Sequence, residues 1–294
     1  MITLAAGRLR AEVDPAYGGR VTRFWETQAD GTAWDWLAPT PAEGREPLVT
    51  LPAGCFPLVP FSNRMGFARF PFDGKTVELA VFPPELHPHR MHGNGHRRGW
   101  DVIASDGDSA EIGFTADFPD WPFPFAARQR IELTPGALSI TISATNTGTT
   151  HMPIGIGLHP YFRRTADVRL RMAFTGAWMG QNPLPPTERS PVPAEMDLAA
   201  GPALGDRSYT HGFDGWDGTA DFTWPEAGRH LRMESSPGLR HCIVHLPQGQ
   251  NYFCVEPVSH AIDAFNLGPA GVPGTGYTII APGEHLSGTM VLRV

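Results

Sequence analysis

Two segments of the sequence place an acid or base side chain in unusually apolar surroundings. GIGLHPYF (155–162) alternates aliphatic residues with glycines and reaches His159, and YFCVEPV (252–258) carries Glu256. A carboxylate on a strand this apolar is costly to bury unless it is paired or takes part in chemistry. A carboxylate and an imidazole together form a usable acid and base pair near neutral pH. His159 and Glu256 are therefore candidate catalytic residues.

Both residues also have plainer explanations. A histidine at the end of a strand can simply be capped by the following turn, and Glu256 can lie on a wet face, bonded to a neighbouring loop. In the catalytic interpretation, Gly155 and Gly157 open space in a cleft, and His159 stands at its edge to move a proton.

Two further segments gather polar groups that suit a ligand. In FPLVPFSNRMG (56–66), Asn63 and Arg64 follow a run rich in Phe and Pro, and a guanidinium offers a fixed fork of donors to ligand oxygens. HPHRMHGNGHRRGW (87–100) is dense in histidine, with His87, His89, His92 and His96. It lacks acidic and thiol ligands, so we expect no metal site but a loop that presents one or two histidines as hydrogen-bond partners.

The tryptophan content favours a carbohydrate as the ligand, because flat aromatic rings pack on the C–H faces of sugars while polar groups bind the hydroxyls. Aromatic residues also fill sandwich cores, so this signal is weak on its own. The eight tryptophans are Trp25, Trp34, Trp36, Trp100, Trp121, Trp178, Trp216 and Trp224.

Period-two alternation predicts that strands position these residues. In 109–118 and 137–146 every second residue is apolar, as in half-buried antiparallel strands, and 241–247, 252–258 and 289–294 are further candidates. We expect no helix beyond short turns, and we interpret the Pro-rich stretch 181–197 as a surface loop. The predicted fold is all-β, a large antiparallel β-sandwich formed by a single domain over residues 1–294.

Bulk properties exclude several function classes. A net charge of −7 argues against nucleic acid and anionic membrane surfaces as partners, and no run of 18 apolar residues predicts a membrane span. Three cysteines without a CxxC pair indicate neither a disulfide framework nor a zinc knuckle, so a reduced cytoplasmic setting is expected. The absence of GxSxG, GxGxxG and P-loop motifs disfavours serine hydrolysis and nucleotide binding.

Five segments together resemble the aldose 1-epimerase (mutarotase) family, including its hexose-6-phosphate epimerase relatives. They are NRMG (63–66), RMHGNGHRRGW (90–100), PFPFAARQRIELTPGALSITISATNTG (122–148), GIGLHPYF (155–162) and CVEPVSHAIDAFN (254–266). The resemblance implies a galactose mutarotase-like supersandwich. It also implies interconversion of the α and β anomers of a free aldohexose or related sugar, such as galactose or glucose, with no metal or organic cofactor.

The resemblance also implies roles for particular residues. His159 of HPYF corresponds to the general acid that protonates the ring oxygen, and Glu256 of VEP to the general base that takes the proton from the C1 hydroxyl. Arg64 of the NR pair, with Asn63 beside it, and His92 of the HG pair correspond to ligands of the sugar oxygens.

One segment departs from the family pattern. The family places a substrate-binding aspartate in a DHxF-like segment before a GWDG turn, but YTHGFDGWDGTADF (209–222) has Thr210 at that position. Asp214, or alternatively Asp206, is a candidate replacement, and Trp216 of the GWDG turn is a candidate for substrate binding.

Three alternatives stay open. One is a non-catalytic sugar-binding or sensing protein on the same fold, which the missing aspartate motivates. Another is an epimerase of a hexose 6-phosphate, with Arg69, Arg97 and Arg98 as candidate phosphate ligands. The last is a hydrolase or lyase, although such enzymes usually need two carboxylates. The sequence is compatible with a monomer or a homodimer.

Overall fold

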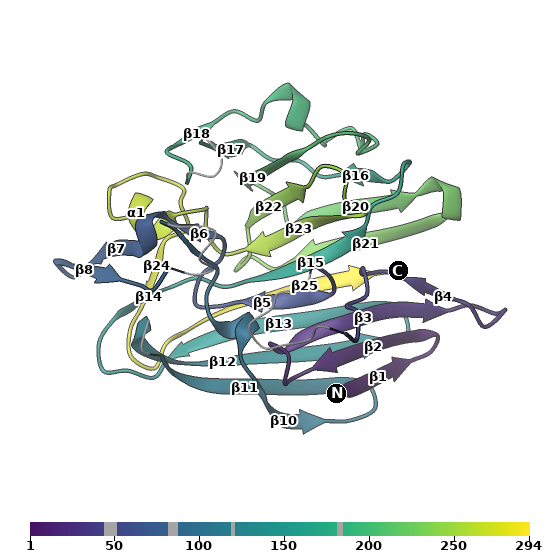
Figure 1. Ribbon diagram of the computed structural model, residues 1–294, viewed down its shortest axis with the longest axis horizontal. Coiled ribbons are helices and arrows are strands. Elements are labelled where there is room, and N and C mark those ends of the chain that lie inside the picture. The colour runs from purple at the N-terminus through teal and green to yellow at the C-terminus, as the bar shows by residue number, and fades with distance from the viewer. Residues whose placement is uncertain (44–51, 82–87, 119–120, 181–184) are drawn as a thin grey trace.

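In the computed structural model of the chain, the described residues are 1–43, 52–81, 88–118, 121–180 and 185–294. They form two large antiparallel sheets that appear as two layers in Figure 1. The first sheet, eleven-stranded in the described part, runs in the order β1 (Ile2–Ala6), β2 (Leu9–Asp14), β3 (Arg20–Thr27), β5 (Cys55–Leu58), β15 (Gly157–Arg163), β23 (Tyr252–Val258), β22 (His241–Leu246), β19 (Tyr209–Asp214), β17 (Gly176–Met179) and β18 (Glu188–Ser190), and β4 (Ala33–Asp35) pairs with β3.

The second large sheet closes the sandwich. Its eight described strands run in the order β10 (Asp101–Ser105), β11 (Ser109–Phe118), β12 (Trp121–Thr134), β13 (Ala137–Asn146), β25 (His285–Arg293), β21 (Arg229–Ser235), β20 (Thr219–Trp224) and β16 (Arg169–Arg171). At one end of the molecule β1 and β2 pack on β11 and β12 (Figure 1).

Small elements gather at one side of the sandwich. They are the two-stranded sheets β14 (Met152–Ile154) with β24 (Thr278–Ile280), β6 (Arg64–Met65) with β9 (Arg90–Met91), and β7 (Arg69–Phe72) with β8 (Lys75–Glu78). The short helix α1 (Ala264–Leu267) contacts β6 and β7, and 3₁₀ turns occupy Gly66–Ala68, Gly95–Arg97, Ala194–Met196 and Pro225–Ala227. No helix in the described ranges is long and apolar enough to cross a membrane.

The main core lies between the two sheets, as the alternation predicts. The apolar residues of the two best-patterned segments are all buried: Ala110, Ile112, Phe114 and Ala116 on β11, and Leu138, Ile140, Ile142 and Ala144 on β13. Strands β11, β13, β22, β23 and β25 confirm the predicted strands, and the fold is the predicted all-β sandwich.

A second, smaller apolar cluster lies on the other face of the eleven-stranded sheet. We call it the site-side cluster; it comprises Phe56, Leu58, Tyr161, Ile243, Cys254, Val258 and Ile262. Strand β23 shows how one strand serves both faces, because Phe253 and Val255 belong to the main core while Cys254 belongs to the site-side cluster. This confirms the prediction that Tyr252, Cys254 and Glu256 share a face.

Two segments differ from the sequence-based expectation. Within the Pro-rich stretch, the described residues include the edge strand β18 and a 3₁₀ turn, so this part is not simply a loop; residues 181–184 lie outside the described ranges. The run 154–162 is not one strand, because the pairing of β14 ends at Ile154 and β15 begins at Gly157.

Candidate active site

His159 and Glu256 lie on adjacent strands of the eleven-stranded sheet. The register pairs Gly157 with Val258 and Tyr161 with Cys254, which sets His159 directly opposite Glu256. Their side chains meet, with 3.3 Å between Nε2 of His159 and Oε1 of Glu256. Two residues that are 97 positions apart in sequence are therefore joined by strand pairing alone.

Burial controls the charge of this pair. The exposed fractions are 6% for His159 and 2% for Glu256. Burial raises the pKa of the Glu256 carboxyl well above its ordinary value, and burial lowers the pKa of His159 well below its ordinary value, helped by the nearby His92 and His245. The neutral forms, a carboxylic acid and an uncharged imidazole, are thus favoured in the folded protein.

Aromatic rings fix the orientation of the His159 imidazole. Tyr161 stacks on it at 4.7 Å between ring centres, and Phe56 stacks at 4.5 Å. His92 contacts the same ring edge-on at 5.4 Å. Packing therefore holds the ring with its Nε2 facing Glu256.

Two buried polar atoms of this pair have no hydrogen-bond partner among the described residues. They are Nδ1 of His159 and Oε2 of Glu256. Most buried polar atoms in native proteins are satisfied, so an unsatisfied one calls for an explanation such as a ligand, a water or a catalytic role. This observation marks the pair as a site and disfavours the interpretation of His159 as a capped strand end.

A tight loop directs His92 at the same place. Asn63 and His92 both adopt left-handed backbone conformations, with φ of 56° and 53°. The backbone N–H of Asn63 donates to Nδ1 of His92 at 2.9 Å, and the N–H of His92 donates to the carbonyl of Asn63 at 2.8 Å. Burial, with Arg64 and Arg97 nearby, lowers the pKa of His92 to about 3. His92 is therefore neutral, and because Nδ1 accepts, its Nε2 carries the hydrogen and can donate.

Asn63 and Arg64 have different tasks. Oδ1 of Asn63 accepts the backbone N–H of Arg64, so this side chain shapes the loop. The Arg64 guanidinium is half-buried, its Nε has no acceptor among the described residues, and burial lowers its pKa. Its charge also depresses the pKa values of His92 and His245, which places Arg64 beside both rings.

The two candidates after Thr210 are used elsewhere in the structure. Arg189 of β18 donates hydrogen bonds from two nitrogens to the Asp214 carboxylate, each at 2.7 Å from an oxygen. Trp216 is buried in the main core, on the far side of the sheet from the site-side cluster, and its indole N–H donates to the Thr219 carbonyl at 2.6 Å. Neither residue makes a contact with His159 within the described part of the chain.

Thr210 has a partner that the sequence reasoning missed. Its hydroxyl lies 2.7 Å from Nδ1 of His245, its cross-strand neighbour on β22. The alternation of side chains on the strand of Glu256 also applies to the neighbouring strand, but it indicates that His245 shares the face of Glu256 only when the order of the strands is known.

Two further residues lie near the pair. His96, predicted only as part of the histidine-rich loop, stacks its ring on Phe56 at 5.1 Å. Arg20 was also missed, and its guanidinium carbon lies 4.7 Å from the Phe56 ring centre.

The space beside the two glycines is filled, contrary to expectation. A Cβ on Gly155 would lie 2.1 Å from the His260 ring, and a Cβ on Gly157 would lie 2.6 Å from Val258. The His260 ring is held on both nitrogens, since Nε2 accepts the Ser62 backbone N–H and Nδ1 lies 2.7 Å from the Ala261 carbonyl. The glycines allow close packing of a structural histidine and do not open floor for a ligand.

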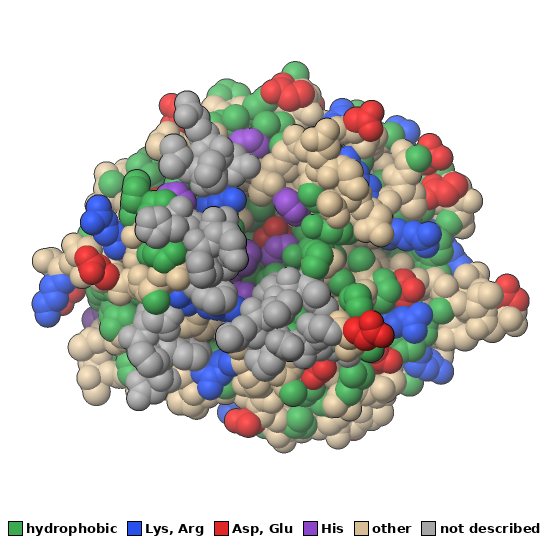
Figure 2. Space-filling model, in the orientation of Figure 1, with side chains coloured by type: hydrophobic (Ala, Val, Ile, Leu, Met, Phe, Trp, Pro, Cys, Tyr) green, Lys and Arg blue, Asp and Glu red, His purple; other side chains and the backbone are tan. Residues whose placement is uncertain are grey.

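One face of the molecule is hollowed. Figure 2 shows histidine and acidic side chains together at the bottom of this hollow, with arginine or lysine nearby. Among the described residues, no three His, Cys, Asp or Glu side chains are placed to hold a metal ion, and His87 lies outside those residues.

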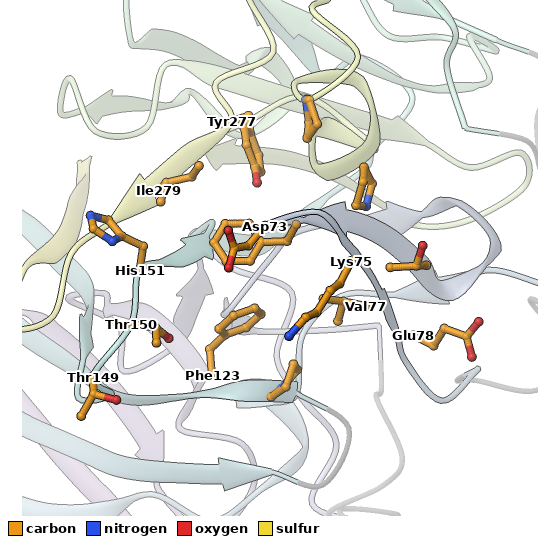
Figure 3. Close-up of a pocket in the computed structure, with 15 residues that line it drawn as sticks. Asp73, Lys75, Val77, Glu78, Phe123, Thr149, Thr150, His151, Tyr277 and Ile279 are labelled. Carbon is orange, nitrogen blue, oxygen red and sulfur yellow. The ribbon is translucent and has the colours of Figure 1, made fainter.

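A separate cavity of about 1180 Å³ lies between the β7–β8 hairpin, β12 and the β14–β24 pair (Figure 3). Tyr277 and Ile279 line one side of it, and Phe123 and Lys75 line another. None of its described lining residues belongs to the site-side cluster or to the histidines around His159. It is distinct from the candidate active site.

Comparison with known proteins agrees with this geometry. The family model for aldose 1-epimerase matches residues 1–293. YphB of Escherichia coli, an uncharacterised protein, is 29% identical over 300 residues, covering 99% of this chain and 98% of its own.

Solved structures show the same fold. A candidate aldose 1-epimerase from Escherichia coli K12 is 28% identical with a TM-score of 0.86, covering 99% of this chain and 97% of its own. A galactose mutarotase-like protein from Clostridium acetobutylicum is 20% identical with a TM-score of 0.84, covering 99% and 93%. With its whole length matched by the family model and its site assembled by the pairing of β15 and β23, the chain belongs to the aldose 1-epimerase family.

Proposed function

We propose that the protein interconverts the α and β anomers of an aldose by acid–base catalysis. The observation that carries this proposal is the buried pair of His159 and Glu256, with 3.3 Å between nitrogen and oxygen and one further unpartnered polar atom on each side chain. Opening a sugar hemiacetal needs one proton removed from the C1 hydroxyl and one delivered to the ring oxygen. Two adjacent groups that differ in basicity can perform both transfers.

The proton count of the pair matches the reaction. Because the two side chains are 3.3 Å apart, the cycle begins with transfer of the Glu256 proton to His159, which makes Glu256 a carboxylate and His159 an imidazolium. The carboxylate takes the C1 hydroxyl proton, the bond between C1 and the ring oxygen breaks, and the ring oxygen takes the proton of His159. The products are a carboxylic acid, a neutral imidazole and the open-chain aldehyde. Rotation about the C1–C2 bond and reversal of both transfers give the other anomer.

Burial favours this ring-open stage of the cycle. The ion pair and the neutral pair hold the same number of protons, and the raised pKa of Glu256 with the lowered pKa of His159 both favour the neutral pair. The apolar surroundings therefore favour the protonation state that the pair holds once the sugar ring has opened. Arg64 and the Nε2–H of His92 supply donors for the sugar oxygens during the transfer.

Other chemistry has less support. Glycoside hydrolysis usually needs a second carboxylate flanking the bond. Of the acidic groups near the site, Asp263 accepts from the Gly66 backbone N–H at 2.8 Å and from Asn266 at 2.7 Å, so it is engaged in holding the loop.

Polarimetry tests the proposal directly. Freshly dissolved α-glucose and α-galactose are followed with and without protein, at a pH where spontaneous mutarotation is slow. Faster relaxation to the same final rotation supports an epimerase, and the same assay on glucose 6-phosphate examines the phosphorylated substrate class. Saturable sugar binding by calorimetry without any acceleration would replace the proposal with a sugar-binding protein.

A further inference from the structure

The pair formed by Thr210 and His245 stands beside the catalytic pair and is not used by the mechanism above. On β22, Ile243 is the cross-strand neighbour of Glu256, and His245 is the neighbour of Cys254. Cross-strand neighbours share a face of the sheet. His245 therefore presents its ring on the face that carries Glu256, two residues farther along the strand.

The His245 ring is held on one nitrogen only. Its Nδ1 lies 2.7 Å from the Thr210 hydroxyl, which orients the ring. Its Nε2 has no partner among the described residues, yet this atom is not among the buried unsatisfied ones, so it reaches solvent. A ring fixed through Nδ1 with a solvent-facing Nε2 is arranged to bind a ligand through that second nitrogen.

The surroundings keep this group uncharged. Burial, with the charge of Arg64, lowers the pKa of His245 to about 4, and the Tyr252 ring lies beside it, at 6.3 Å between ring centres. The Asp214 carboxylate, four residues after Thr210 on β19, is bound by Arg189. A neutral imidazole can bond one hydroxyl as donor or acceptor, whereas a carboxylate would only accept.

We propose that His245, held by Thr210, binds one hydroxyl of the aldose through Nε2 and so determines which sugars the site accepts. This inference rests on the proposed function and deepens it, because it assigns a substrate contact outside the acid–base pair. His245 touches no reacting atom in this account. Its loss therefore acts on binding of the sugar and on discrimination among sugars.

Three variants separate a contact from a structural role. Gln places its amide nitrogen near the position of Nε2, so His245→Gln retains the contact, whereas His245→Ala removes it. A neutral hydrogen bond is worth roughly 1 kcal/mol, so we expect the alanine variant to raise KM about 3- to 10-fold with kcat little changed. Thr210→Val should give a smaller rise, because the ring loses only its orientation. His285→Ala, at an exposed histidine that begins β25 in the other sheet, is the matched control.

The rates of anomer exchange of a panel of monodeoxy sugars, measured by polarimetry or exchange NMR, distinguish a direct contact with one hydroxyl from a structural role of His245. In the wild-type protein one deoxy sugar should lose the same 3- to 10-fold, and that sugar should be insensitive to His245→Ala. An alanine variant that penalises every sugar equally, or a glutamine variant as impaired as alanine, would overturn the inference while leaving the proposed function intact. A wild-type protein that neither binds nor interconverts any aldose would overturn both.

Discussion

At the scale of residues, the site depends on which nitrogen of each histidine is already engaged. Nδ1 of His92 accepts a backbone N–H, and both nitrogens of His260 are used in the fold. His159 has an unpartnered Nδ1, and its Nε2 faces Glu256. Residue type alone does not separate these histidines, whereas their hydrogen bonds distinguish the structural His260 from His92 and His159, which keep the free nitrogens that the proposed mechanism uses.

His92→Asn tests the role of the second nitrogen. The Asn side-chain oxygen can take the place of Nδ1 and accept the Asn63 N–H, but nothing replaces the Nε2–H. We expect the melting temperature to stay close to that of the wild type while kcat/KM for anomer exchange falls roughly 10- to 100-fold. His92→Gln should lower the melting temperature more than His92→Asn does, because its amide no longer accepts the Asn63 N–H, while kcat/KM should fall less. Equal activity of His92→Asn and the wild type would remove His92 from the site.

At the scale of elements, the pairing of β15 with β23 assembles the site, and the loop between β14 and β15 braces it. Gly155 lies in this loop against His260, and His260 in turn receives the Ser62 N–H that precedes the Asn63 turn. The glycines thus act through close packing against neighbouring side chains.

Gly155→Ala tests this account of the glycines. A methyl group 2.1 Å from the His260 ring cannot be accommodated without movement of the ring or the backbone. Overpacking of this kind costs roughly 1–3 kcal/mol, measured by urea unfolding. Gly136→Ala is the control, since nothing lies within 4 Å of a Cβ there. A Gly155→Ala protein as stable as the control, with weakened sugar binding, would restore the interpretation of open cleft space.

Much of the architecture could be predicted from local patterns, since a period of two directly reports which face of a strand is buried. The placement of Glu256 on the side of Tyr252 and Cys254 follows from that period and is confirmed. Asp214 and Trp216 could not be placed in the same way, because their partners are Arg189 of an edge strand and the carbonyl of a turn. His245 was missed because its relation to Glu256 depends on strand order, which alternation does not encode.

At the scale of the whole molecule, buried histidines dominate the pH dependence of stability. In the described part of the chain, burial lowers the pKa of six histidines. The pKa falls to about 3 for His92 and to about 4 for His245 and His260, and it is also lowered for His96, His159 and His241. Unfolding restores values near 6.5, so the unfolded chain binds protons that the folded chain does not. Their contribution to stability is complete above pH 6.5 and is lost as the pH falls towards 4.

Two carboxyls oppose this trend in part. Burial raises the pKa of Asp263 to about 6 and raises the pKa of Glu256 well above its ordinary value, so both carboxyls hold protons in the folded chain that they lose on unfolding. The histidines at about 3 to 4 (His92, His245 and His260) set against Asp263 at about 6 give a net uptake of about two protons on unfolding, so the unfolding free energy should fall by about 2.7 kcal/mol per pH unit around pH 5. Urea unfolding at pH 7, 6 and 5 measures this slope. A decrease of less than about 1.4 kcal/mol per unit, equivalent to a single proton, would show that the histidines are not held neutral.

The central claim is that Glu256 exchanges a proton with the sugar, and Glu256→Gln tests it most directly. Because burial keeps the folded carboxyl protonated, the amide is nearly isosteric and should leave the fold and sugar binding intact. The measurement is the rate of anomer exchange at equilibrium, by exchange NMR on the aldose that the wild-type protein converts fastest. We expect a loss of about 10²–10⁴-fold with Kd nearly unchanged. A Glu256→Gln protein that exchanges anomers at the wild-type rate would contradict the account.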